Sequence, residues 1–212
     1  MRPLSLCNQN QKTLASLQAK DFDGAVQSAS CALRDLKRDI GSFDGIPPAD
    51  EIAGDALDQC MHLNKVGCSI STDATSPFIY DRGIILPSTM EDGAIMTTVL
   101  VFNAALANHL LAISENNDRS LKYLHRARQL YQLAHEGQDI DQNFLFHFAV
   151  INNLALIDQS LGDAESSQKS FEYLISVIMI LITQEQSAIV SQLSGFLVNM
   201  PFSIKATAAA AA

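Results

Sequence analysis

Two stretches of sequence with a shared order of residue types decide the fold of this chain. The first is FNAALANHLLAI (Phe102–Ile113) followed by SLKYLHRARQLYQLA (Ser120–Ala134), and the second is INNLALIDQSLGD (Ile151–Asp163) followed by AESSQKSFEYLIS (Ala164–Ser176). Apolar residues recur every three or four positions in each stretch, and a short polar or glycine-containing link divides it in two. This periodicity predicts two helical hairpins, over residues 93–136 and 141–182.

The start of the chain predicts a further hairpin, over residues 8–38. Leu14 and Leu17 mark an apolar stripe on its first helix, and Asp21 precedes the second helix as a natural N-cap. Asp163 has the same place in the last hairpin. A C-terminal helix over residues 184–198 and an Ala-rich tail over 203–212 complete the chain. We interpret residues 1–212 as a single all-α domain of helical repeats.

An insertion over residues 39–92 separates the first hairpin from the others. It is dense in Gly, Pro, Ser and Asp, and Pro47-Pro48 breaks any helix there. We expect a short helix near residues 49–63, then extended chain through GCSIS and FIYDRGIILP. Its alternating apolar residues fit either a two-stranded ribbon or an arm lying across the helices. An arm that covers apolar helix surface and a functional or partly mobile loop both remain open.

Composition narrows the classes of partner. The 212 residues are 48% hydrophobic and 17% charged, which allows a buried core. The net charge of −9 disfavours binding to nucleic acid. We see no signal peptide and no apolar run of the ~20 residues that a membrane span needs. The four Cys residues lack CxxC spacing. The sequence therefore predicts a cytoplasmic or nuclear protein without membrane insertion.

Catalytic, metal and cofactor motifs are absent from the sequence. Neither an HExxH pair nor a glycine-rich phosphate loop occurs, and the acidic residues between 39 and 58 lack the spacing of an EF-hand. No nucleophile-elbow pattern surrounds Ser194-Gly195. We predict no catalytic residue, no metal site and no cofactor, and hence that the protein is not an enzyme.

The hairpins resemble the tetratricopeptide repeat. On the second helix of a hairpin, that family places Ala, an aromatic residue four positions later, and Ala three positions after that, as Ala127, Tyr131 and Ala134 do here. The next hairpin matches with Ser167 and Phe171 but has Leu174 in place of Ala. The usual Trp is missing, and the spacing between repeats exceeds roughly 34 residues. The arrangement also resembles repeat families of algal type. The resemblance implies a degenerate tetratricopeptide-like α-solenoid.

In the family that the hairpins resemble, first helices line a concave face that holds an extended peptide. Asn residues on that face often hydrogen-bond the peptide backbone, and Asn103 and Asn153 occupy equivalent places. By position, the resemblance implies a peptide- or protein-binding face of Phe102, Asn103, Leu106, His109, Asn152, Asn153, Leu156 and Gln159. Two alternatives remain open: these Asn residues bond neighbouring helix backbone, or the arm near residues 70–90 fills the face.

Two functions follow from these patterns. The first is a non-catalytic scaffold that binds a peptide or protein through the concave face or the insertion. The second is a structural subunit that associates with its own copies or a larger assembly through the C-terminal helix. That helix is too apolar for an exposed terminal helix: Ile189, Val190, Leu193, Phe196, Leu197 and Val198.

Overall fold

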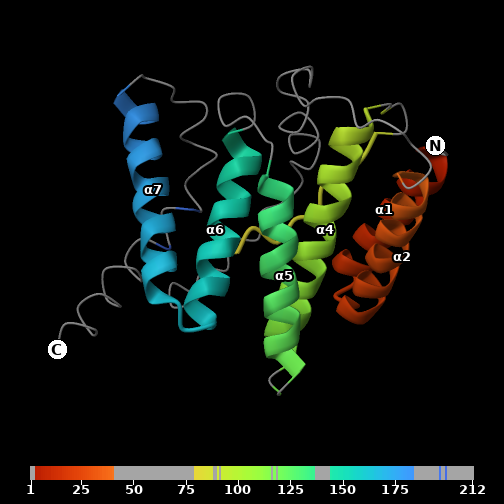
Figure 1. Ribbon diagram of the computed structural model, residues 1–212, viewed down its shortest axis with the longest axis horizontal. Helices are drawn as coiled ribbons and strands as arrows, with labels where there is room; N and C mark the ends of the chain where they lie inside the picture. Colours follow the sequence, from red (N-terminus) through yellow and green to blue (C-terminus); the bar gives the residue numbers. More distant parts are fainter. Residues whose placement is uncertain are drawn as a thin grey trace. The chain divides into compact units, whose positions relative to one another are not determined.

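The computed structural model describes residues 3–40, 79–87, 90, 92–115, 117, 119–136, 144–183, 196 and 199. Its helices are α1 (Pro3–Gln18), α2 (Phe22–Ile40), α4 (Gly93–Ser114), α5 (Arg119–His135), α6 (Phe144–Ser160) and α7 (Ala164–Thr183) (Figure 1). No described residue lies in a β-strand. The predicted all-α class is therefore confirmed for this part of the chain.

Aspartate side chains begin three of the helices. Asp21 accepts a hydrogen bond from the Gly24 N–H at 3.0 Å, and Asp163 accepts one from the Ser166 N–H at 3.1 Å. Asp92 accepts from the N–H groups of Ala94 and Ile95 before α4. Each bond satisfies a backbone donor that has no partner within its own helix. The predicted caps at Asp21 and Asp163 are present.

The chain divides into two compact units. Unit 1 consists of Met1–Lys65 and Asp81–Phe146, and unit 2 consists of Val66–Tyr80 and His147–Ala212. Nothing in this division tests the prediction of one repeat domain over residues 1–212, which stays a prediction.

Helix α4 is the core helix of unit 1, where it packs against α1, α2 and α5. Most of its residues are buried, including Val99, Phe102 and Leu106. Among the described helices, α4 alone is long and apolar enough to cross a membrane, but 83% of its most apolar window is buried inside the protein. Burial by neighbouring helices explains this apolar sequence without a membrane.

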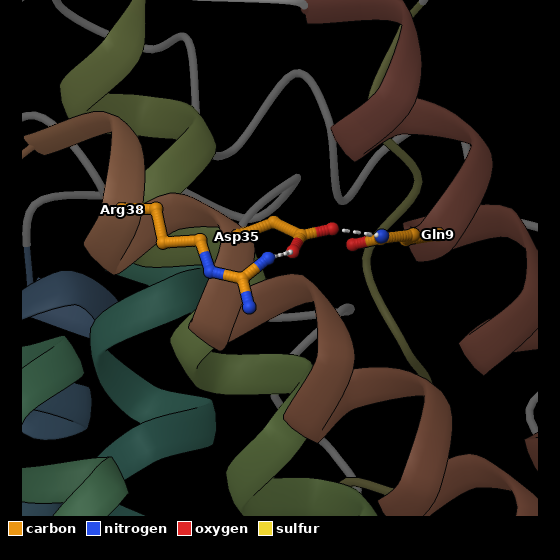
Figure 2. Close-up of polar contacts among 3 residues, drawn as sticks. All are labelled: Gln9, Asp35 and Arg38. Carbon is orange, nitrogen blue, oxygen red and sulfur yellow. Dashed lines mark hydrogen bonds and ion pairs between the residues drawn. The ribbon is translucent and has the colours of Figure 1, made fainter.

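Helices α1 and α2 of unit 1 form the N-terminal hairpin. Ala25, Ala29 and Ala32 of α2 are buried, so this helix presents small side chains to its neighbours. Figure 2 shows a polar link across the hairpin, in which the Gln9 amide of α1 donates to Asp35 of α2 at 2.6 Å. Arg38 pairs with the other oxygen of the same carboxylate at 3.5 Å (Figure 2).

Helix α5 packs on α4 through small and aromatic residues of the pattern seen in the sequence. Ala127, Tyr131 and Ala134 are buried. The Tyr131 ring meets the edge of Phe102 of α4, with 5.6 Å between ring centroids. The aromatic residue of the pattern therefore fills space that the two alanines leave, as ring pairs at this distance do in protein cores.

Helix α7 and residues 147–160 of α6 belong to unit 2, and a tight turn connects them (Figure 1). Gly162 in this turn has φ +82°, a left-handed conformation that glycine adopts without steric cost. The hydroxyl of Tyr173 lies 3.3 Å from Nε2 of His147, which links α7 to α6. Helix α7 buries Ser167, Phe171, Leu174, Ile178 and Leu181.

Of the predicted insertion over residues 39–92, residues 39–40 belong to α2, and the longest described segment is non-helical, residues 79–87, which we call the arm. Ile84 and Leu86 are buried while Ile85 between them is exposed, an alternation typical of extended chain. The predicted short helix at 49–63, the GCSIS segment, the Ala-rich tail, and all of the predicted helix 184–198 except Phe196 lie outside the described residues. The predicted two-stranded ribbon stays a prediction.

Candidate functional site: asparagines that hold the arm

In unit 1, the side chain of Asn103 on α4 binds both backbone groups of a single arm residue. Its Oδ1 accepts from the Ile84 N–H at 2.7 Å, and its Nδ2 donates to the Ile84 carbonyl at 2.8 Å. An amide side chain thus pairs with the arm as a neighbouring strand would. Because only main-chain atoms of Ile84 take part, this pairing does not depend on the side chain at position 84.

Asn10 of α1 supports the same contact from a second helix. Its Nδ2 donates to the Ile84 carbonyl at 3.0 Å, and its Oδ1 accepts from Asn103 Nδ2 at 2.7 Å. Asn10, Asn103 and Ile84 are all buried. Hydrogen bonds between buried groups are strong because water does not compete, and their loss would leave polar atoms without partners. We call these two side chains the Asn103 clamp.

The arm fits closely against the Asn103 clamp. A Cβ atom added at Gly83 would lie 2.2 Å from Cδ2 of Leu14, so the backbone approaches α1 at a distance that only glycine allows without a shift. Ile84 and Leu86 are 0% and 1% exposed, whereas Ile85 is 37% exposed. The Cys7 thiol lies 3.9 Å from the Pro87 carbonyl. Close approach and alternate burial together fix the register of the arm.

In unit 2, Asn153 of α6 binds another arm residue in the same way. Its Oδ1 accepts from the Tyr80 N–H at 3.0 Å, and its Nδ2 donates to the Tyr80 carbonyl at 3.0 Å. The neighbouring Asn152 donates to Asn153 Oδ1 at 3.1 Å and accepts from Asn199 Nδ2 at 2.6 Å. We call Asn152 and Asn153 the Asn153 clamp.

Aromatic rings complete the contact of the arm in unit 2. The ring of Tyr80 stacks on Phe196, with 6.3 Å between centroids and 5° between planes. Phe196 in turn meets Phe148 of α6 edge-on at 5.8 Å. Offset stacking and edge contacts of this kind add to the stabilisation that burial of the rings provides. An aromatic residue of the arm is therefore held by its side chain as well as by its backbone.

The residues predicted to line a binding face fall into two groups. Asn103 and Asn153 hold the arm, and Asn152 supports the second of them. The others make no described contact with the arm. Phe102 packs against Tyr131 and Phe146, His109 lies with its ring against Tyr131, Leu106 and Leu156 are buried, and Gln159 is exposed. Asn103 and Asn153 both bond the backbone of the arm. Whether the arm fills a concave face stays a prediction. That these residues bind a partner stays a prediction.

Sequence reasoning missed Asn10, Asn199 and Phe196 as parts of the site. A signal for Asn10 was present, because this polar residue follows Leu6 by four positions and precedes Leu14 by four on one face of α1. A buried amide in an apolar stripe requires a hydrogen-bonding partner. Nothing local distinguishes Asn199. Phe196 belongs to the apolar pattern of the predicted C-terminal helix, but that pattern does not indicate its contact with Tyr80.

Burial shifts the pKa of several titratable groups in unit 1. Burial lowers the pKa of His109 on α4 to about 4, so this imidazole is neutral at physiological pH. Burial raises the pKa of the Asp81 carboxyl and of the Cys7 thiol. No group of three or more His, Cys, Asp or Glu residues that could hold a metal ion occurs among the described residues. What the site offers is a set of amide groups directed at a polypeptide backbone.

Comparison of the chain with models of protein families, with curated proteins and with solved structures gives no match.

Proposed function

We propose that this protein is a non-catalytic interaction scaffold that binds a peptide or protein segment through its asparagine-bearing helices or through the insertion. The observation that carries the proposal is the pair of clamps, in which amide side chains hold the backbone of an arm residue. Asn side chains that hydrogen-bond main-chain atoms can bind peptides of many sequences, as in peptide recognition by strand addition. The ligand class is therefore extended polypeptide.

Several further parts of the proposal rest on sequence patterns. The hairpins are tetratricopeptide-like repeats of an α-solenoid, which is supported by the burial of Ala127, Tyr131 and Ala134. The net charge of −9 favours a protein partner over nucleic acid. A cytoplasmic or nuclear location is in keeping with the scaffold role.

A partner can bind in two ways. It replaces the arm at a clamp, or it binds the outward side of the arm, where Ile85 is exposed. Substitutions distinguish these two binding modes. An Asn103→Ala/Asn153→Ala double variant weakens the first, and Ile85→Ser weakens the second while leaving the buried arm contacts intact.

A pull-down from cell extract, with recovered proteins quantified by mass spectrometry, tests this proposal. We expect at least one protein that wild type recovers to be lost from the double variant or from Ile85→Ser. Asn108→Ala is the matched control, because Asn108 is a buried Asn of α4 whose described bond goes to the Ala104 carbonyl of its own helix. Equal recovery of every protein by all four proteins, each shown to be folded by circular dichroism, would contradict the scaffold.

A second candidate function is assembly with further copies of the same chain. Met179, Ile180 and Ile182 in the last turns of α7 are exposed by 56%, 53% and 47%. Adjacent exposed aliphatic side chains of this kind are typical of interaction surfaces. We expect Ile180→Glu to lower the sedimentation coefficient of an oligomer, and Leu133→Glu, which alters an equally exposed residue of α5, to leave it unchanged. A monodisperse wild-type monomer would contradict assembly.

A further inference from the structure

The arm residues in unit 1 occupy a surface of α1 and α4 in the way a bound peptide would. Their contacts therefore indicate which peptide sequences this surface can bind. Cys7, Asn10 and Leu14 of α1 and Asn103 of α4 make up this face, which we call the arm-binding face. The bound residues are 83–87, with the sequence Gly-Ile-Ile-Leu-Pro. The contacts of these residues given above fall into those with the backbone of the ligand and those with its side chains.

Recognition of the backbone is concentrated at one position. The Ile84 N–H has Asn103 Oδ1 as its acceptor, and the Ile84 carbonyl accepts from both Asn103 and Asn10. The Asn10–Asn103 bond at 2.7 Å orients the two amides toward Ile84. Because this donor and acceptor pair binds main-chain atoms, it holds an extended backbone without adding a preference for the side chain at this position.

Selectivity for the sequence of the ligand comes from the side chain at position 84 and from the residues on either side of it. Gly83 passes so close to Leu14 that a Cβ atom would require a shift of a buried leucine. Positions 84 and 86 are fully buried and take aliphatic side chains, while position 85 faces outward. Two buried aliphatic residues separated by an exposed one give the face a hydrophobic contribution that a polar sequence would lack.

We propose that the arm-binding face takes, from a partner protein, an extended segment with the pattern Gly–aliphatic–any–aliphatic, and that residues 83–86 of the arm compete for the same place. The inference rests on the proposed scaffold function and deepens it by naming the ligand. Because the arm is covalently attached, it competes at an effective concentration on the order of millimolar. A partner segment therefore binds well only when the arm is weakened or the partner makes further contacts.

The experiment uses the full chain and a fluorescein-labelled peptide with the sequence of residues 81–87, DRGIILP. Fluorescence anisotropy measures its affinity for wild type and for Ile84→Asp, in which a carboxylate at a fully buried position drives the arm off the face. We expect the peptide to bind Ile84→Asp at least about tenfold more tightly than wild type, because its intramolecular competitor is lost.

Two further variants assign the binding to the clamp, and one altered peptide tests the buried side-chain position. Adding Asn103→Ala to Ile84→Asp should weaken peptide binding by about tenfold, which corresponds to the loss of roughly 1.4 kcal/mol. Adding Asn108→Ala instead should leave it unchanged, since Asn108 bonds its own helix. A peptide with aspartate in place of the first isoleucine should not bind. Equal affinity for wild type and Ile84→Asp, or binding that does not need Asn103, would overturn the proposal.

Wild type alone provides a test that does not depend on the folding of Ile84→Asp. Excess unlabelled DRGIILP should accelerate hydrogen exchange at the Ile84 amide, because displacement removes its Asn103 partner. No acceleration at saturating peptide would overturn the proposal. Association of copies of the chain with one another in place of peptide binding would also overturn it, and would assign the face to the arm of a second copy.

Failure of this inference and failure of the scaffold function give different results. If the peptide does not bind but Asn103-dependent proteins are still recovered from extract, the ligand pattern is wrong and the scaffold stands. If the peptide binds through Asn103 but no recovered protein depends on the clamps or on Ile85, the face accepts the pattern and the scaffold function is wrong.

Discussion

The two clamps bind backbone in the same way but are supported differently. In unit 1 the amide of Asn103 is held by Asn10, which comes from another helix 93 residues earlier in the sequence. In unit 2 the amide of Asn153 is held by Asn152, the adjacent residue, which is itself bonded to Asn199. Equivalent asparagines thus perform equivalent chemistry with supports of unrelated origin.

The arm residues at the two clamps differ even more. The Asn103 clamp holds Ile84 between a glycine that allows close approach and a second buried aliphatic residue. The Asn153 clamp holds Tyr80, whose ring stacks on Phe196. Backbone bonding therefore determines where an extended chain is held, and the surrounding side chains determine which sequence is held there.

The largest effect that we expect belongs to the aromatic support of unit 2. Phe196 is buried and contacts both Tyr80 and Phe148. Phe196→Ala should lower the free energy of unfolding of unit 2 by about 4 kcal/mol, because truncation of a buried Phe leaves a cavity. Hydrogen exchange should accelerate more at the Tyr80 amide than at the Ile84 amide, whose described partners lie in unit 1. Equal acceleration at both amides would show that the clamps do not have separate supports.

The Asn103 clamp gives the next effect. Asn103→Ala removes two bonds to Ile84 and one to Asn10, and it leaves the buried Ile84 N–H without its described acceptor. We expect the free energy of unfolding to fall by about 3 kcal/mol, at about 1 kcal/mol for each of the three bonds. Urea denaturation measures the change.

Asn108→Ala is the control for this substitution. Among the described residues, the Oδ1 atom of Asn108 is buried with no hydrogen-bond partner, and its Nδ2 bonds only the Ala104 carbonyl one turn earlier. Because alanine also favours helix, the change should cost less than about 1 kcal/mol. If both substitutions cost the same, the bonds of Asn103 to the arm contribute nothing to the stability of unit 1.

The sequence predicted local features of this fold well. The helices of the hairpins follow from apolar periodicity, and the caps at Asp21 and Asp163 from residue type and position. The burial of Tyr131 follows from its place between small residues on α5. Each of these depends on residues within a few positions of one another, where the geometry of a helix is known in advance.

The identity of the arm's partners could not be predicted in the same way. Asn10 bonds a residue 74 positions away, and Asn153 bonds one 73 positions away. Contacts across such distances depend on how helices and arm pack in three dimensions, and no local pattern contains that information. Asn103 and Asn153 were identified only by resemblance.

A buried histidine of unit 1 gives a smaller and pH-dependent effect. Nδ1 of His109 is buried without a hydrogen-bond partner among the described residues. Burial lowers the pKa of His109 to about 4, below the value of ~6.5 in an unfolded chain. The unfolded chain therefore takes up a proton first as pH falls, so this contribution to stability is complete above ~6.5 and is lost towards about 4.

From these values, stability should fall by about 2 kcal/mol between roughly pH 7 and pH 5 through His109 alone. Urea denaturation at a series of pH values measures the fall, and His109→Leu should remove that part of it. The comparison with the variant matters because other groups also titrate. Burial lowers the pKa of His135 and raises that of Asp81, and those contributions are common to both proteins. Identical pH profiles for the two proteins would contradict a buried neutral His109.

The smallest effect that we expect concerns Asn10, the residue that supports the Asn103 clamp. Asn10→Ala removes one of the two donors to the Ile84 carbonyl, and Asn103 remains as the other donor. Asn103 Nδ2 loses Asn10 as an acceptor but keeps the Ile84 carbonyl. Because no buried group of the clamp loses all of its partners, the free energy of unfolding should fall by only about 1 kcal/mol. A double-mutant cycle between Asn10 and Asn103, followed by urea denaturation, measures their coupling. Coupling near zero would mean that Asn10 does not orient the clamp, and that the difference in support between the two units has no energetic consequence.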